Sequence, residues 1–339
     1  MSRDKFWKKW GVLFSGDKIT LAEQLKFAAD AESAGAESLW SAELWRDGFV
    51  PLAAMATVAR KVRLGTGVAH FARTPMLTEL SAMSMAELSD GRFILGLGTA
   101  PKAWNEDWHG LPYHHPVDRM REYIECVRLM WTSSPEHPIQ YDGKFYKIRN
   151  YRRLNTPPPY RIPIYLAAVL PGMMRLAGSH ADGIIVNVLN TPRYFQEVVQ
   201  PYVKQGLELA GKKPFEWCAV KVCSVNRNRK QAQGLARNAI AFYSAIPYFD
   251  AVLDPAGFKS QKERIRALLA AGDVAGAIDA VSDEMVDALV LAGTPDDVHR
   301  QLEPFRDCFE TLILLSPTFA AEAAQVRENH EAIIDAFAS

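Results

Sequence analysis

Short apolar runs alternate with amphipathic stretches along most of this chain. Runs rich in Val, Ile and Leu are typical of strands buried on both faces, and apolar residues three and four positions apart indicate helices. The pattern predicts eight strands, at Trp10–Phe14, Glu37–Ala42, Val62–Val68, Phe93–Leu97, Ile164–Ala168, Gly183–Val188, Glu216–Val225 and Glu310–Leu315. It predicts helices between them, at Leu21–Ala34, Pro51–Arg60, Met76–Leu88, Val117–Trp131, Gly172–His180, Pro192–Ala210 and Ala320–Phe337.

Capping residues mark the ends of two predicted helices. Thr20 is a candidate N-cap with Glu23 three residues later, which is the spacing of a capping box. Gly35 ends that helix, because glycine readily takes the left-handed conformation of a C-terminal cap. Thr294 and Pro295 begin another helix as its N-cap and first residue.

Regular alternation of strands and helices predicts a parallel sheet covered by helices, and eight strands favour a closed (β/α)8 TIM barrel. An open, doubly wound sheet is the alternative, but no G-x-G-x-x-G pattern follows the first strand. Two insertions depart from the repeat: a β-hairpin near residues 139–148, turning at Asp142-Gly143, and a helical region near residues 230–292. No linker-like segment divides the chain, so we expect one domain over residues 1–339.

The composition and charge of the chain limit the classes of binding partner. The chain has 39 Lys and Arg residues and 39 Asp and Glu residues, so no net charge attracts nucleic acid or an anionic membrane. No apolar run is long enough to span a bilayer, and the N-terminus lacks the apolar stretch of a signal peptide. The four cysteines are scattered through apolar patterns, which indicates buried free thiols. We expect a soluble, cytoplasmic protein that acts on a small molecule.

The segment between Val62 and Pro116 carries most of the information about function. Its two strands both end in glycine, at Gly65-Thr66-Gly67-Val68 and at Gly98-Thr99, with a helix between them. Strand, helix and strand at this spacing form a parallel βαβ unit. Because α/β proteins bind ligands at the C-terminal ends of their strands, both glycine pairs are predicted to lie at a binding site.

Five patches resemble the luciferase-like monooxygenase superfamily, and they occur in order across nearly the whole chain. They are Ala28–Glu43, Arg63–Pro75, Leu88–Thr99, Pro163–Asn187 and Gly293–Val298. The resemblance implies a (β/α)8 barrel that holds a flavin or a deazaflavin at the C-terminal ends of its strands. Three further features are most similar to the branch that uses coenzyme F420, that of the methylene-tetrahydromethanopterin reductases: Glu43-x-Trp45-Arg46-Asp47, Asn105–Gly110 and Arg121-Glu122-Tyr123.

The resemblance implies a set of cofactor-binding residues. In the deazaflavin enzymes, the place of Gly67-Val68 holds a non-prolyl cis peptide that backs the ring. The helix that begins at Pro171-Gly172 offers N–H groups and a partial positive charge to a cofactor phosphate. Leu170 departs from the family, where glycine is frequent. The cofactor-binding residues predicted are Gly67, Val68, Ala69, Gly98, Thr99, Asn105, Ala168, Pro171, Gly172 and Met173. The structural alternative is that these glycines only close tight strand ends and an ordinary turn.

Candidate proton-transfer residues are Glu43, Glu106 and His109. Glu43 follows the second strand, an address typical of catalytic residues in barrels. Many relatives place histidine after this acid, where this chain has Leu44. The alternative for Glu43 is an ion pair with Arg46 or Arg73.

An aromatic loop is predicted to cover the substrate. The candidate substrate contacts are His70, Trp45, Trp104 and Trp108. Neither H-E-x-x-H nor C-x-x-C is present, so no metal site is expected. A structural lock at Trp108–Gly110 is the alternative interpretation of part of this loop.

These observations lead to an oxidoreductase that transfers a hydride between coenzyme F420 and an organic substrate. One alternative is a flavin mononucleotide (FMN)-dependent monooxygenase that receives reduced flavin from a partner reductase. A second is a barrel that binds a cofactor without turnover. The resemblance also implies a homodimer and an F420 or flavin reductase as a supplier of reduced cofactor.

Overall fold

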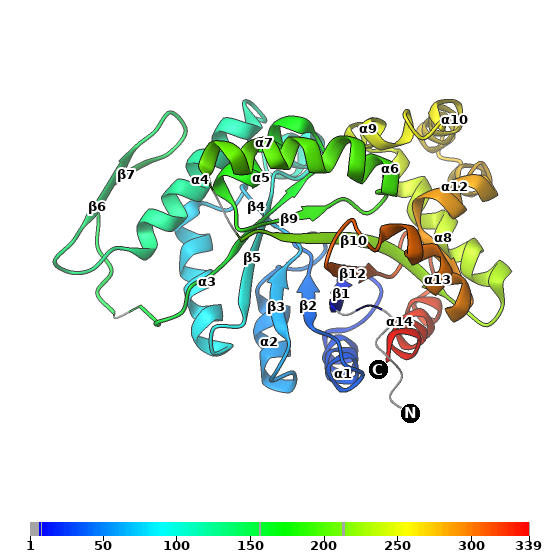
Figure 1. Cartoon of the computed structure of the whole chain (residues 1–339), viewed down its shortest axis with the longest axis horizontal. Helices are drawn as coiled ribbons and strands as arrows, with labels where there is room; N and C mark the ends of the chain where they lie inside the picture. Colours follow the sequence, from blue (N-terminus) through cyan, green and yellow to red (C-terminus); the bar gives the residue numbers. More distant parts are fainter. Residues whose placement is uncertain (1–6, 8, 156, 212–213, 339) are drawn as a thin grey trace.

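The computed structural model describes residues 7, 9–155, 157–211 and 214–338. Within these residues, eight parallel strands form a closed barrel (Figure 1): β1 (Lys9–Phe14), β2 (Ser38–Ser41), β3 (Arg63–Thr66), β5 (Phe93–Gly98), β8 (Ile164–Ala168), β9 (Gly183–Val186), β10 (Glu216–Val225) and β12 (Thr311–Leu315). The strands pair in this order, and β12 pairs with β1 to close the ring. The predicted (β/α)8 fold is confirmed, and the open-sheet alternative is wrong.

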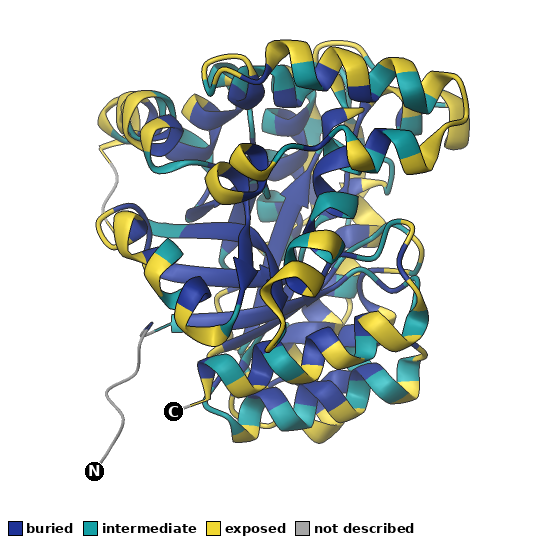
Figure 2. Ribbon diagram, turned by 90° about the vertical axis from the view of Figure 1, so that its right-hand side faces the viewer, coloured by how far each residue is buried: buried dark blue, intermediate teal, exposed yellow. Residues whose placement is uncertain are grey.

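Helices surround the barrel, with their outer faces exposed and the strands buried inside (Figure 2). The helices of the repeat are α1 (Leu21–Ser33), α2 (Val50–Val58), α3 (Pro75–Leu88), α4 (Pro116–Trp131), α5 (Pro171–His180), α6 (Pro192–Tyr194), α7 (Gln200–Ala210), α8 (Arg229–Ser244), α13 (Pro295–Leu302) and α14 (Ala323–Phe337). Both predicted N-caps are confirmed: Thr20 forms a capping box with Glu23, and Thr294 forms one with Asp297. Gly35 has φ +91°, as expected for the residue that ends α1.

The side chains that fill the barrel interior differ from one end of the barrel to the other. At the N-terminal ends of the strands, Glu216 accepts hydrogen bonds from Lys9, at 3.2 Å, and from Thr311, at 2.9 Å. In the middle, the buried Trp40 ring occupies the space that a side chain on Gly65 would need. Polar side chains therefore fill the barrel at the N-terminal ends of the strands, and the Trp40 indole fills its middle. The open space lies towards the C-terminal ends of the strands.

Both predicted insertions are present. The hairpin consists of β6 (Ile139–Asp142) and β7 (Lys147–Tyr151), and it extends away from the barrel beside α4 (Figure 1). The helical insertion continues from α8 through a short 3-10 turn, Pro247–Phe249, and through α9 (Asp250–Leu253), α10 (Lys259–Ala270), α11 (Val274–Asp279) and α12 (Asp283–Leu289).

Three of the predicted elements are wrong in detail. The helical region does not reach Ala292, because Leu291–Gly293 forms strand β11 and pairs with the end of the long strand β10. The helix predicted over residues 192–210 is interrupted by a π-helical turn, Phe195–Val199, which ends two residues before Pro201. Proline lacks the N–H group that a continuous α-helix needs at that position.

The strand predicted over residues 62–68 ends early. It ends as β3 at Thr66, the Gly67–Val68 peptide bond is cis, and a two-residue strand, β4 (Ala69–His70), then pairs with β5. Cys126, Cys218, Cys223 and Cys308 are buried free thiols, as predicted. None of the helices in the described part of the chain is long and apolar enough to cross a membrane.

Gly96 is required by the close approach of β3 and β5. A Cβ atom there would collide with the backbone carbonyl oxygen of Thr66, and a backbone atom cannot move aside cheaply. We expect Gly96→Ala to reduce the free energy of unfolding by about 1–3 kcal/mol. Gly234 lies in α8 with open space around it, so Gly234→Ala is expected to stabilise the protein by up to about 1 kcal/mol. Thermal unfolding of both variants tests the opposite signs, and equal midpoints would contradict the packing argument.

Candidate active site

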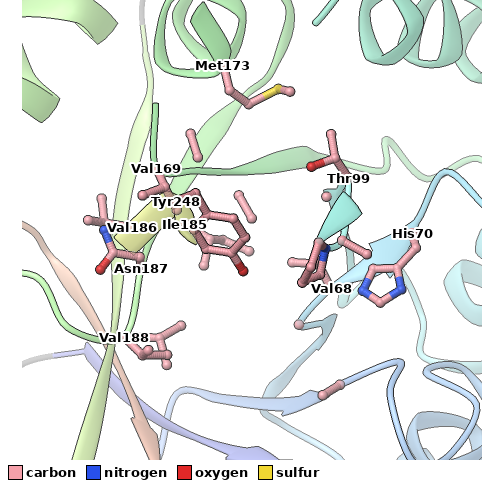
Figure 3. Close-up of a pocket in the computed structure, with 18 of the residues that line it drawn as sticks. Val68, His70, Thr99, Val169, Met173, Ile185, Val186, Asn187, Val188 and Tyr248 are labelled. Atoms are coloured by element: carbon pink, nitrogen blue, oxygen red, sulfur yellow. The ribbon is translucent and has the colours of Figure 1, made fainter. Parts of the chain in front are cut away.

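A cavity of about 470 Å³ opens at the C-terminal ends of the barrel strands. Val68 and Thr99 line one side, and Val186 and Asn187, from the end of β9 and the residue that follows it, line the opposite side (Figure 3). Tyr248, from the helical insertion, reaches in between them. The cavity therefore lies where the sequence placed it, and its size is within the range of small-molecule sites.

The side formed by β3 and β5 is a flat bed of small and aliphatic residues. Gly67, Val68 and Gly98 line it, and a Cβ atom on Gly98 would press into Val68 Cγ2. A Cβ atom on Gly67 would meet Leu13 Cδ1 at 2.7 Å. Because neither glycine carries a side chain, this part of the surface consists of backbone and the Val68 side chain, and it fits a flat aromatic ring.

Helix α5 begins at the rim of the same cavity. Gly172 and Met173 line the cavity, and Gly172 has only Val117 Cγ2 near the position of a Cβ atom, at 3.2 Å. The first turn of a helix favours an anion through its free N–H groups and its partial positive charge. Here the Met173 N–H group already donates to the Leu170 carbonyl oxygen at 3.1 Å. Leu170, the departure from the family, has an extended backbone (φ −105°, ψ 153°) that any residue adopts. The leucine therefore leaves the start of this helix intact.

Glu43 lies at the junction of the main cavity and a neighbouring chamber of about 260 Å³. Its Oε2 accepts a hydrogen bond from the His70 N–H group at 2.9 Å, and its Oε1 accepts one from Arg73 at 2.9 Å. The same guanidinium donates to Asp47 at 3.0 Å, so two carboxylates balance one positive charge. Burial raises the pKa of the Glu43 carboxyl, although His70 and Arg73 oppose the shift.

Glu43 therefore both pairs with Arg73 and lines the cavity. Arg46 takes no part in it, because its guanidinium donates to the carbonyl oxygens of Gly16 and Ile19. His70 lines both spaces, and burial lowers the pKa of its imidazole to about 4, with a further contribution from His109. The imidazole is thus neutral at pH 7.

The predicted aromatic loop forms a wall between the two spaces. Residues Trp104–Trp108 form a π-helical turn in which these two indoles stack, with centroids 4.9 Å apart. Trp45 adds a third ring, 5.9 Å from Trp108. Trp104 faces both spaces, whereas Trp108 and His109 face only the smaller chamber.

Several predicted residues lie beside the cavity without lining it. Asn105 is buried, and its amide donates to the carbonyl oxygens of Thr99 and Pro101, so it shapes the loop at the cavity edge. Glu106 turns away, where it accepts from the Tyr113 N–H group and pairs with Lys102 at 3.7 Å. The remaining predicted residues divide into two groups. Thr99, Ala168, Gly172 and Met173 line the cavity, whereas Ala69, Pro171 and Trp45 do not.

The comparisons with known proteins agree with this architecture. The sequence profile of the luciferase-like monooxygenases matches residues 10–309 of the 339. The chain belongs to the luciferase-like monooxygenase family. It is 31% identical to the 5,10-methylenetetrahydromethanopterin reductase of Archaeoglobus fulgidus over 300 residues, which are 86% of this chain and 87% of that one. The predicted resemblance to this branch is confirmed.

Solved structures of luciferase-like proteins share the fold. The coenzyme F420-dependent tetrahydromethanopterin reductase of Methanopyrus kandleri superposes with a TM-score of 0.83, at 24% identity, over 98% of this chain and 99% of that one. The oxygenating constituent of a Pseudomonas putida 3,6-diketocamphane monooxygenase, solved with FMN, superposes with a TM-score of 0.68, at 18% identity, over 98% of each chain.

One wall of the cavity is formed by residues that the sequence did not predict. Tyr243, Tyr248 and Phe249 come from α8 and the turn after it, within the helical insertion. The apolar periodicity of the insertion indicates that one face of its helices is buried. It does not indicate which part of the barrel that face packs against. Asn187 was also missed, although its position directly after β9 is a typical address for a site residue.

The buried imidazole of His70 yields a pH prediction. Free histidine has a pKa of about 6.5, so the unfolded chain binds a proton there while the folded chain does not. Stability from the buried neutral ring is therefore lost as the pH falls from 6.5 towards the folded pKa of about 4. Long-range ¹H–¹⁵N NMR should show the His70 ring neutral at pH 5.5, with His70→Gln identifying its signals. Titration near pH 6.5 would contradict this placement.

Proposed function

We propose that the protein is a coenzyme F420-dependent oxidoreductase that transfers a hydride between the deazaflavin and an organic substrate. The observation that carries the proposal is one cavity that combines a glycine-rich bed at the ends of β3 and β5 with the first turn of α5. A cofactor with a flat ring and a phosphate needs both features in one cavity. The similarity to a methylenetetrahydromethanopterin reductase supports the choice of a deazaflavin.

In this proposal, Gly67, Val68 and Gly98 support the ring, and the first turn of α5, at Gly172, faces the phosphate. The hydride chemistry is supplied by the deazaflavin when bound, and the protein orients it and manages the proton.

Glu43 is the acid that we assign to proton exchange. Its carboxyl lines the cavity, and its raised pKa brings it closer to the range in which it holds a proton. The hydrogen bonds from His70 and Arg73 fix its orientation. His70, neutral and adjacent to Glu43, is available as a hydrogen-bonding partner of the substrate.

An FMN-dependent monooxygenase is the second candidate. The first turn of α5 suits any terminal phosphate, and a family member of the same fold was solved with FMN. This candidate requires a partner reductase and consumes oxygen. Oxygen uptake with reduced FMN would favour it.

Replacement of Gly172 tests the cofactor assignment. Gly172→Val adds a branched side chain at the start of α5, inside the cavity and beside Val117. We expect affinity for oxidised F420, followed by fluorescence titration, to fall at least about tenfold, which corresponds to about 1.4 kcal/mol. Gly234→Val, a matched change on an open helix face, should leave the affinity unchanged.

Three results would contradict the proposal. Tighter binding of FMN than of F420 would move the protein to the oxygen-using candidate. Unchanged F420 affinity in a folded Gly172→Val variant would show that the first turn of α5 does not hold the cofactor. Binding without turnover across hydride acceptors would favour a cofactor-binding barrel.

We also propose a homodimer through α2 and α3. These helices pack side by side and expose several large apolar side chains, namely Val50, Val58, Met76, Leu77, Leu80 and Leu88. Contiguous exposed apolar surface on a globular protein is typical of an interaction site. A second copy of this chain is the occupant that we expect.

Charge substitution on α3 tests the dimer. Leu77→Glu combined with Leu80→Glu is expected to convert a dimer into a monomer, because a carboxylate at the interface loses its hydration. The control is Leu209→Glu on α7, where the leucine side chain is 83% exposed outside that surface. Analytical ultracentrifugation gives the masses, and a monomeric wild type would contradict the proposal.

A further inference from the structure

Tyr243, Tyr248 and Phe249 form an aromatic wall across the cavity mouth. The Phe249 ring packs against Tyr243, with centroids 5.4 Å apart, and against Tyr248 at 4.9 Å. Arg266 fixes the turn that carries them, because its side chain donates to the Ser244 carbonyl at 2.8 Å and to Asp250 at 2.6 Å. These hydrogen bonds therefore fix the position of the aromatic wall relative to the strands.

The Tyr248 hydroxyl points into the cavity, towards the side that carries Val68 and Thr99 (Figure 3). It has no hydrogen-bond partner among the residues that the structure describes. Burial raises the pKa of this phenol, so the group stays protonated and offers an O–H donor. A donor that faces a cavity without a protein acceptor is suited to an oxygen atom of a ligand.

Apart from the first turn of α5, which we assign to the cofactor phosphate, the cavity offers no positive charge to a substrate anion. Within the described part of the chain, its lining includes no lysine and no arginine. The guanidinium of Arg73 lies in the smaller chamber, where Glu43 and Asp47 already neutralise it. His70 is neutral, and Glu43 would repel an anion. A carboxylate or phosphate on the substrate would lose its hydration here without compensation.

Most of the remaining lining is aliphatic or aromatic, including Leu44, Ile185, Val188, Val220 and Leu315. Together with the aromatic wall, these residues make the rest of the cavity surface largely apolar. If the bed supports the cofactor ring, the substrate lies between the ring and Tyr248.

We propose that the substrate is an electrically neutral, largely apolar molecule with one hydrogen-bonding oxygen, and that the Tyr248 hydroxyl binds this oxygen. The inference rests on the proposed function, because the assignment of the bed to the cofactor ring defines the substrate side. Tyr248 thereby selects and positions the substrate, while charged substrates are excluded by the lining.

Two matched probes test the inference. 2-Naphthol is uncharged at neutral pH and carries one hydroxyl, and 6-hydroxynaphthalene-2-sulfonate adds one anionic group to the same skeleton. We expect calorimetry on the F420-loaded protein to show 2-naphthol binding at least about tenfold more tightly than the sulfonate. Tyr248→Phe should weaken 2-naphthol binding about three- to tenfold, the loss of one hydrogen bond, and leave F420 affinity unchanged.

Two further variants test whether the effects are specific to Tyr248 and to the charge of the lining. Tyr160→Phe changes a tyrosine in a separate pocket, lined also by Met83 and Trp131, and should leave 2-naphthol binding unchanged. Leu44→Lys places a cation on the half-buried edge of the cavity and should reduce the preference for 2-naphthol over the sulfonate.

The inference is overturned if 2-naphthol does not bind, if the sulfonate binds as tightly, or if Tyr248→Phe binds 2-naphthol like the wild type. The same titrations without cofactor separate it from the proposed function. Failure of F420 to bind refutes the proposed function, whereas the preference between the two probes in the cofactor-free protein reports on the lining of the cavity alone.

Discussion

The packing of the Trp40 indole against Gly65 inside the barrel is the contact on which the rest of the site depends. The ring occupies the space of the missing glycine side chain. It closes the barrel below the level of Gly67, where a Cβ atom would lie 3.5 Å from Trp40 Cβ. The cavity lies above this level, and Leu13 and Gly67 line it there. Its shape is then set by the strand ends and by the loops that follow them.

Charge in the site is confined to one corner. Glu43, Asp47 and Arg73 form a cluster at the edge of the smaller chamber, and the guanidinium bonds to both carboxylates. Burial keeps His70 neutral, so the main cavity is apolar apart from one carboxyl and a few hydroxyl and amide groups. In a medium of low polarity, these few groups act more strongly than they would in water. This division suits redox chemistry in which the protein supplies a proton and excludes charged competitors.

The sequence predicted the strand side of the site well and the opposite side poorly. Gly67, Gly98 and Gly172 were found because strand ends and helix starts have local signals. Glu106 was placed at the site from its neighbours in the chain, but the π-helical turn directs it towards Lys102 and the Tyr113 backbone. The short strand at Leu291–Gly293 was missed because its partner is the distant strand β10.

Local signals in the chain were enough to predict the barrel, the strand ends that carry the glycines, the helix caps and the family, because each signal lies in residues close together in sequence. Which side chains meet across the cavity depends on tertiary packing. Tyr248 reaches Val68 and Val186 only through the fold of an insertion whose local pattern reports helix and nothing more. The ion pairing of Glu43 with Arg73 was also one of two options until the fold placed Arg46 on the carbonyl oxygens of Gly16 and Ile19. Contacts between residues distant in the chain depend on packing geometry, which local periodicity does not contain.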